Sequence, residues 1–145
     1  TITDSSGKVI SKLYYTVSYS NNIKPGYAEV KVKFKKLYKG IMNKKFIIKP
    51  AKVKLSKIVN QKGRMIKITW EKSKGVGGYE IWYANDKKLK KGRKIMDVKA
   101  SSKAITIKKL SKNKTYYVKI RGYKKINKRK VYGAWSKRKS VKITK

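Results

Sequence analysis

The sequence predicts an all-β fold, with a small antiparallel β unit over residues 1–50 and a seven-stranded β-sandwich over residues 51–145. Apolar and polar residues alternate with a period of two over most of the chain, which is the pattern of half-buried strands. No segment of appreciable length shows the 3.6-residue periodicity of an α-helix. The chain is 39% hydrophobic and 11% aromatic, which is enough apolar material for a packed core despite the many charged residues.

Three segments of the first unit show the alternation of strands. Residues 13–19 alternate first, and a turn with Pro25 and Gly26 separates them from residues 28–34. A second turn lies around residues 38–40, and residues 46–48 form a last short strand. A sheet this small covers both of its faces poorly. We therefore expect this unit to be incomplete or to lean on the second one.

The second unit contains seven predicted strands, the last of them broken near Ser136. Trp70 and Tyr116 are expected in its core. The glycines of residues 75–78 lie between two strands and precede no helix, so they indicate a turn and not a phosphate-binding loop. The predicted strands cover residues 53–58, 65–70, 79–83, 95–98, 104–107, 115–123, and 131–135 with 141–143.

Four motifs of the second unit occur in a characteristic order. They are I-T-W at residues 68–70, G-Y-E-I-W-Y at 78–83, Leu110 followed by Tyr116, and Y-G-A-W-S at 132–136. From about Pro50 to the C-terminus the chain thereby resembles a bacterial fibronectin type III domain. The resemblance implies a seven-stranded Greek-key sandwich that serves as a spacer, adhesion or accessory module, and it implies no catalytic residue.

The first unit is similar to short Ig-like β-repeats that precede such modules in Firmicutes surface proteins. The resemblance implies a secreted or cell-surface protein of a Gram-positive bacterium, of which this chain is one part. The residues that carry it are Tyr19, Asn22, Gly26, Ala28, Val30, Tyr38, Gly40 and Phe46.

The sequence argues against an enzyme and against a cofactor. It has no histidine and no cysteine, and its six carboxylates are scattered. Proton transfer needs a positioned acid or base, and a metal site needs clustered ligands. Glu80 alternates with core residues and is expected to face outward. No apolar run is long enough to span a membrane.

The charge is the strongest functional signal, because 43 basic residues against 6 acidic ones give a formal net charge of +37. A solvated surface explains a moderate excess, but an excess this large destabilises a compact state through self-repulsion. A polyanionic partner would relieve the repulsion. We therefore favour a binding surface over a merely soluble one.

The predicted polyanion-binding site consists of two clusters of basic residues together with Lys119 and Arg121, which lie between them in the sequence. Trp82 is a candidate exposed aromatic for stacking, and the alternative is that it packs under neighbouring lysine stems. Trp135 is expected to interleave with Lys119 and Arg121. The predicted binding residues are Lys87, Lys88, Lys90, Lys91, Arg93, Lys94, Lys119, Arg121, Lys124, Lys125, Lys128, Arg129 and Lys130.

The kind of polyanion follows from the excess of lysine over arginine. Arginine forks read bases, whereas lysines act as diffuse point charges on phosphate. A cell-wall teichoic acid or an acidic polysaccharide is the favoured partner, and sequence-nonspecific nucleic-acid binding is an alternative. A structural spacer within a larger adhesin or hydrolase is the other alternative.

Overall fold

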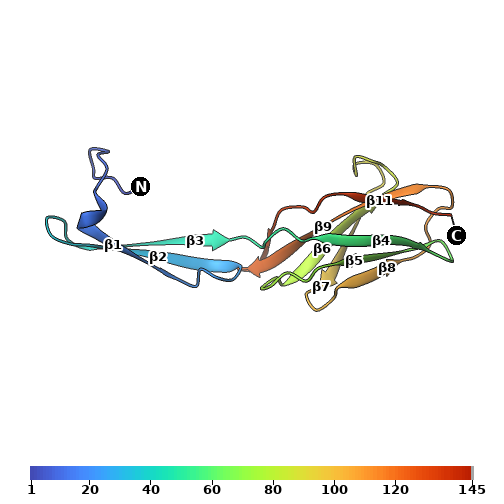
Figure 1. Cartoon of the computed structure of the whole chain (residues 1–145), viewed down its shortest axis with the longest axis horizontal. Coiled ribbons are helices and arrows are strands. Elements are labelled where there is room, and N and C mark those ends of the chain that lie inside the picture. Colours follow the sequence, from blue (N-terminus) through green and yellow to red (C-terminus); the bar gives the residue numbers. More distant parts are fainter. Residues whose placement is uncertain (145) are drawn as a thin grey trace. The chain divides into compact units, whose positions relative to one another are not determined.

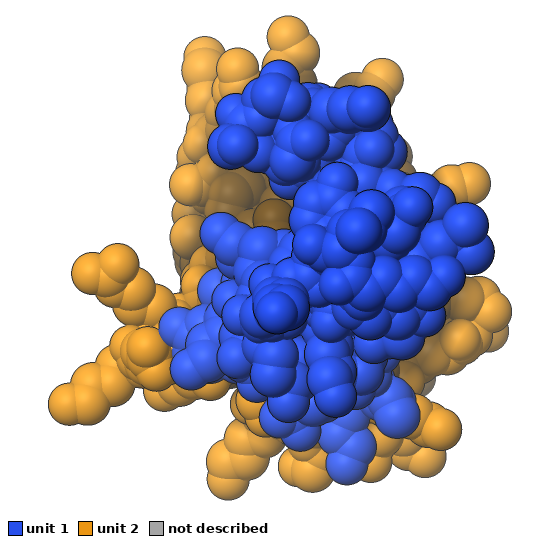
Figure 2. All heavy atoms as spheres, turned by 90° about the vertical axis from the view of Figure 1, so that its left-hand side faces the viewer, with its two compact units in different colours: residues 1–48 blue, residues 49–145 orange. Residues whose placement is uncertain are grey.

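The computed structural model describes residues 1–144 and confirms the all-β prediction (Figure 1). The chain divides into two compact units, Thr1–Ile48 and a second that begins at Lys49 (Figure 2). The division falls two residues before the predicted one. Within residues 1–144 the single helix is the three-residue 3-10 helix η1 (Lys12–Tyr14), and no helix there is long and apolar enough to cross a membrane.

Unit 1 is a three-stranded antiparallel sheet in the order β1-β2-β3. Its strands are β1 (Tyr15–Ser20), β2 (Gly26–Phe34) and β3 (Ile41–Ile48). Two details of the prediction are wrong. Leu13 lies in η1 and is exposed, because Ser11 caps this turn by accepting a hydrogen bond from the Leu13 amide. Strand β3 begins five residues before the predicted strand at residue 46, because β2 is long enough to pair with it from Gly26 to Lys33.

One face of the unit 1 sheet carries most of its apolar side chains. Ala28 and Val32 are buried there, and Ile10 of the segment that precedes η1 is also buried. Val17 and Tyr19 remain exposed, since three strands and one short segment cannot close this face. A hollow of about 630 Å³ remains beside them; it is lined by Thr1, Ile2, Lys12, Tyr15, Val17, Tyr19, Val30, Val32 and Met42.

Unit 2 is a sandwich of two antiparallel sheets. One sheet has the order β4-β5-β8, from β4 (Leu55–Gln61), β5 (Met65–Trp70) and β8 (Ala104–Ile107). The other has the order β10-β9-β6-β7, and β11 also pairs with β9. Its strands are β6 (Gly78–Ala84), β7 (Lys94–Lys99), β9 (Thr115–Ile126), β10 (Arg129–Tyr132) and β11 (Lys139–Lys142).

The predicted break in the last strand separates β10 from β11. Ser136 holds the chain against β9 at this break, because its amide donates to the Ile120 carbonyl and its hydroxyl accepts from the Ile120 amide. Gly133 is required nearby, since a Cβ there would lie 2.4 Å from the Pro50 carbonyl oxygen. Strands β10 and β11 therefore both use the same edge of β9, one after the other.

The core fills the space between the two sheets. Ile66 and Ile68 of β5 face Ile81 of β6 and Ile120 of β9 within one cluster of buried side chains. Trp70 is 3% exposed, as predicted, and its ring lies edge-on to Tyr79 at 5.4 Å between centroids. The alternation that predicted these strands thus gives the correct inward face for each of them.

Tyr116 closes the core at the start of β9. Its hydroxyl accepts a hydrogen bond of 3.1 Å from the Ser111 amide, next to the buried Leu110. Such a tyrosine corner ties a connection to the strand that follows it. The pair of Leu110 and Tyr116 therefore has the structural role that the sequence motif implies.

Replacing Tyr116 with Phe should lower the free energy of unfolding of unit 2 by about 1 kcal/mol, because the Ser111 amide loses its partner. Denaturation followed by tryptophan fluorescence measures this, since all three tryptophans lie in unit 2. Tyr117→Phe on the same strand is the control. Equal losses in the two variants would show that the corner contributes nothing.

Candidate functional site

The outer face of the β6–β9 pair carries the most concentrated group of cations and aromatic rings in unit 2. The two strands pair so that Glu80 lies opposite Arg121 and Trp82 lies opposite Lys119. Tyr79 and Ile81 alternate with Glu80 and Trp82 and are fully buried in the core. The same register that packs the core therefore places these four side chains together on the opposite face.

Basic and aromatic side chains interleave on this face in what we call the ladder: Trp82, Arg93, Lys119, Arg121, Tyr132 and Trp135. The rings of Trp82 and Trp135 lie 4.5 Å apart with an interplanar angle of 55°. The Lys119 ammonium lies 4.4 Å from the Trp82 ring centroid and 4.3 Å from that of Trp135. Both distances lie within the range of cation–π attraction.

Arg121 is the most fully bound cation of the ladder. Its guanidinium carbon lies 3.5 Å from the Tyr132 ring centroid and 4.3 Å from that of Trp135. Its Nε and Nη2 both donate to Oε1 of Glu80, at 2.9 and 2.7 Å. Burial and a hydrogen bond with Glu80 raise the pKa of Tyr132. The predicted interleaving of Trp135 with Lys119 and Arg121 is thus present.

Glu80 points away from the core, as its alternation predicts, but it is only 6% exposed. The reason is that Arg121 lies directly over it and holds its carboxylate. A period-two pattern gives the side of a sheet on which a residue lies, and it does not show whether other side chains cover that residue. Glu80 is therefore a buried anchor of the ladder and not a solvated carboxylate.

Trp82 is partly buried, so its prediction as an exposed aromatic is corrected. The Arg93 guanidinium carbon lies 3.8 Å from its ring centroid, and Lys119 and Trp135 contact it as well. The indole Nε1 is buried and has no hydrogen-bond partner. The structure instead agrees with the alternative, in which Trp82 packs under neighbouring basic side chains. These side chains are Lys119 and Arg93.

Lys119 lies among three arginines. Burial lowers its pKa most, and the charges of Arg93, Arg121 and Arg138 lower it further, whereas Glu80 acts in the opposite direction. Arg138 comes from the segment before β11; its guanidinium lies 5.4 Å from the Tyr117 ring and donates to the Lys87 carbonyl. The predicted site lacked Arg138, although its position three residues after Trp135 could have indicated it.

The predicted basic clusters occupy opposite ends of β9. Ala84 of β6 pairs with Tyr117 near the start of β9, so the β6–β7 loop lies at that end. This loop contains the first predicted cluster, which is exposed, and its Arg93 lies over Trp82 as Lys119 does. Its members are Lys87, Lys88, Lys90, Lys91 and Arg93, and Lys94 begins β7.

The second predicted cluster lies in the β9–β10 hairpin, beyond Tyr123, which pairs with Gly78 at the other end of β6. Its members are Lys124, Lys125, Lys128, Arg129 and Lys130. Lys130 is already bound there, because it forms an ion pair with Asp97 and lies 4.6 Å from the Tyr123 ring centroid. The register therefore places the first cluster at the Lys119 end of the ladder, whereas the second cluster meets the ladder at Tyr132, two residues after Lys130.

Asp86 holds the backbone of the β6–β7 loop. Its carboxylate accepts hydrogen bonds from the amides of Lys88, Lys90 and Lys91. These bonds lower the pKa of Asp86. Across residues 1–144 no three His, Cys, Asp or Glu side chains gather into a group that could hold a metal ion.

No protein-family model matches the chain, and no curated protein matches it. Solved structures do match. One is the solution structure of the sixth fibronectin type III domain from human fibronectin type III domain containing protein 3. It is 16% identical, with a TM-score of 0.52 over 66% of this chain and 86% of that one.

Unit 2 has the fibronectin type III fold. A second match is the crystal structure of the FN1-FN3 domains of chicken CNTN1, which is 20% identical with a TM-score of 0.52. It covers 87% of this chain and 44% of that one. The two-sheet topology, the tyrosine corner and these matches agree on the fold of the fibronectin type III unit.

Replacing Arg121 with Gln should destabilise the fibronectin type III unit by about 3 kcal/mol, because the buried Glu80 carboxylate loses its cation. The matched control is Lys130→Gln, which breaks the more exposed pair with Asp97 and should cost less than about 1 kcal/mol. Chemical denaturation of both variants measures the difference. Equal effects would contradict the structural role of the Glu80–Arg121 pair.

The Lys119 ammonium should titrate below the ordinary lysine pKa of 10.5, and Arg93→Gln should move its pKa back upward. The variant removes a nearby positive charge, which favours the protonated form of Lys119. NMR titration of the lysine side chains measures this. Arg64→Gln removes the same charge from the β4–β5 turn and should leave Lys119 unchanged.

Proposed function

We propose that this chain is a non-catalytic accessory or adhesion module of a larger secreted or cell-surface bacterial protein, and that it binds anionic polymers of the cell wall. The observation that carries the proposal is the position of Lys119 among Arg93, Arg121 and Arg138. Glu80 is the carboxylate that acts on Lys119, and Arg121 already holds it. Four cations therefore gather around one carboxylate, and positive charge is concentrated here.

The remainder of the chain offers little compensation either. Within residues 1–144 three ion pairs join side chains, whereas the sequence contains 43 basic residues. Neighbouring charges on such a surface lie within the Debye length of about 8 Å at physiological salt. A flexible polyanion that follows the surface would neutralise many of them at once and so stabilise the folded state.

The geometry of the ladder supports an anion rather than a neutral sugar as the ligand. The outer faces of Trp82 and Trp135 are occupied by cations, so they do not offer a free ring for stacking. What the ladder presents is ammonium and guanidinium groups in fixed positions beside the lysine-rich β6–β7 loop. Phosphate groups of a teichoic acid match that chemistry, and so do the carboxylates or sulfates of an acidic polysaccharide.

Two other functions would use the same fold. A structural spacer needs only the sandwich, and the likeness to fibronectin type III domains is compatible with it. Nonspecific nucleic-acid binding would use the same lysine field on a phosphate backbone. We place the wall polymer first, because the ladder rings are covered and cannot stack on bases as single-strand binders do.

Binding to purified Gram-positive cell walls should fall steeply with salt and drop when teichoic acid is stripped from them. The double variant Arg93→Gln with Arg138→Gln should bind about tenfold more weakly, because it removes two ligand-facing cations. The matched control is Lys57→Gln with Lys67→Gln, which removes the same charge from the outer face of the β4-β5-β8 sheet.

Each alternative has its own result in this assay. Retention no greater than that of a charge-matched unrelated protein would favour the spacer. Tighter binding to DNA than to wall polymer would favour the nucleic-acid function. Unchanged binding to stripped walls would overturn teichoic acid as the partner.

A further inference from the structure

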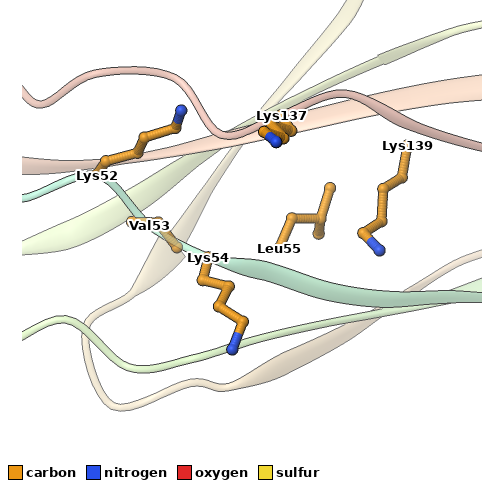
Figure 3. Close-up of a pocket in the computed structure, with 6 residues that line it drawn as sticks. All are labelled: Lys52, Val53, Lys54, Leu55, Lys137 and Lys139. Carbon is orange, nitrogen blue, oxygen red and sulfur yellow. The ribbon is translucent and has the colours of Figure 1, made fainter.

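A second cationic site lies outside the ladder, at the open edge of the sandwich. A groove of about 410 Å³ runs between the chain that leads into β4 and the chain that leads into β11 (Figure 3). It is lined by Lys52, Val53, Lys54, Leu55, Lys137 and Lys139. Val53 and Leu55 are almost fully buried in the core and form an aliphatic floor. Lysines alone provide the charged side chains of its rim.

The charge of the groove is uncompensated. Lys54 forms an ion pair of 2.5 Å with Glu71, and Figure 3 shows its side chain extending away from Lys137 and Lys139. Lys52, Lys137 and Lys139 are exposed, and none of the ion pairs of residues 1–144 includes them. No carboxylate lines the groove. Three unpaired ammonium groups therefore surround an aliphatic floor.

The segment Lys137–Lys139 joins this groove to the ladder. Successive side chains of an extended segment point to opposite sides. Arg138 points to the ladder side, where it contacts Tyr117 and the Lys87 carbonyl, while Lys137 and Lys139 line the groove. One short segment thus presents cations to both surfaces, and a polymer that crosses it would contact both.

We propose that the groove binds a linear chain of phosphate diesters that are joined by short aliphatic or polyol links. This inference rests on the proposed function and adds a binding site and a ligand class to it. The ammonium groups on both rims fit phosphates along a chain, and Val53 and Leu55 fit the carbon atoms between them. The groove lacks amide, carboxylate, hydroxyl and aromatic side chains, which are the groups that hold the hydroxyl-rich rings of a polysaccharide.

The test uses the whole chain and a short glycerol phosphate oligomer as the probe. Lys137→Gln with Lys139→Gln should weaken binding of the oligomer roughly tenfold more than the control pair Lys57→Gln with Lys67→Gln. All four residues are exposed, so both double variants should keep the melting temperature of the native chain. Heparin, a sulfated polysaccharide, should lose affinity equally in the two variants.

A second readout places the ligand directly. Addition of the oligomer should shift the methyl NMR signals of Val53 and Leu55 in the native chain and in the control variant, and the shifts should vanish in the groove variant. If the oligomer binds but the two variants weaken equally and the methyl signals stay unmoved, the groove proposal is wrong and the proposed function stands. If no polyanion binds this chain more tightly than it binds an unrelated protein of the same net charge, both proposals fail.

Discussion

The antiparallel pairing of β6 with β9 is the interaction on which the rest of the fibronectin type III unit depends. It directs Tyr79, Ile81 and Ile120 into the core and brings Glu80 and Trp82 to the other face opposite Arg121 and Lys119. A slip of one residue would exchange these two sets and place charges in the core. The stability of the core and the geometry of the ladder are therefore consequences of one register.

A chain with a net charge of +37 stays ordered because its apolar interior and its cations are kept apart by that register. Part of the repulsion is also offset locally. Arginine and lysine lie over the rings of Trp82, Tyr132 and Trp135, where the negative faces of the rings attract them. One set of aromatic residues, which includes Trp70 and Tyr79, thus stabilises the core. A second set, Trp82, Tyr132 and Trp135, stabilises the cations on the outer face.

The sequence predicted the strands well, because alternation is a local property. Residues 65–70 and 104–107 were placed without error, and the inward face of each core strand was correct. It did not predict the burial of Glu80 and left the exposure of Trp82 open, since Arg121 lies 41 positions from Glu80 and Trp135 lies 53 positions from Trp82 in the sequence. The groove is a further case, because it forms only where residues 52–55 meet residues 137–139 in space. Each of these features depends on residues that are distant in the sequence and close together in the fold, which residue type alone does not reveal.

The three amide hydrogen bonds that Asp86 accepts order the backbone of the β6–β7 loop in the unbound chain. A loop with so many lysines would otherwise spread its like charges apart and lose much conformational entropy on being captured. Because one carboxylate has already ordered it, a partner need not supply that ordering free energy. The loop is thus preorganised for binding by one of the six acidic residues of a chain that has 43 basic ones.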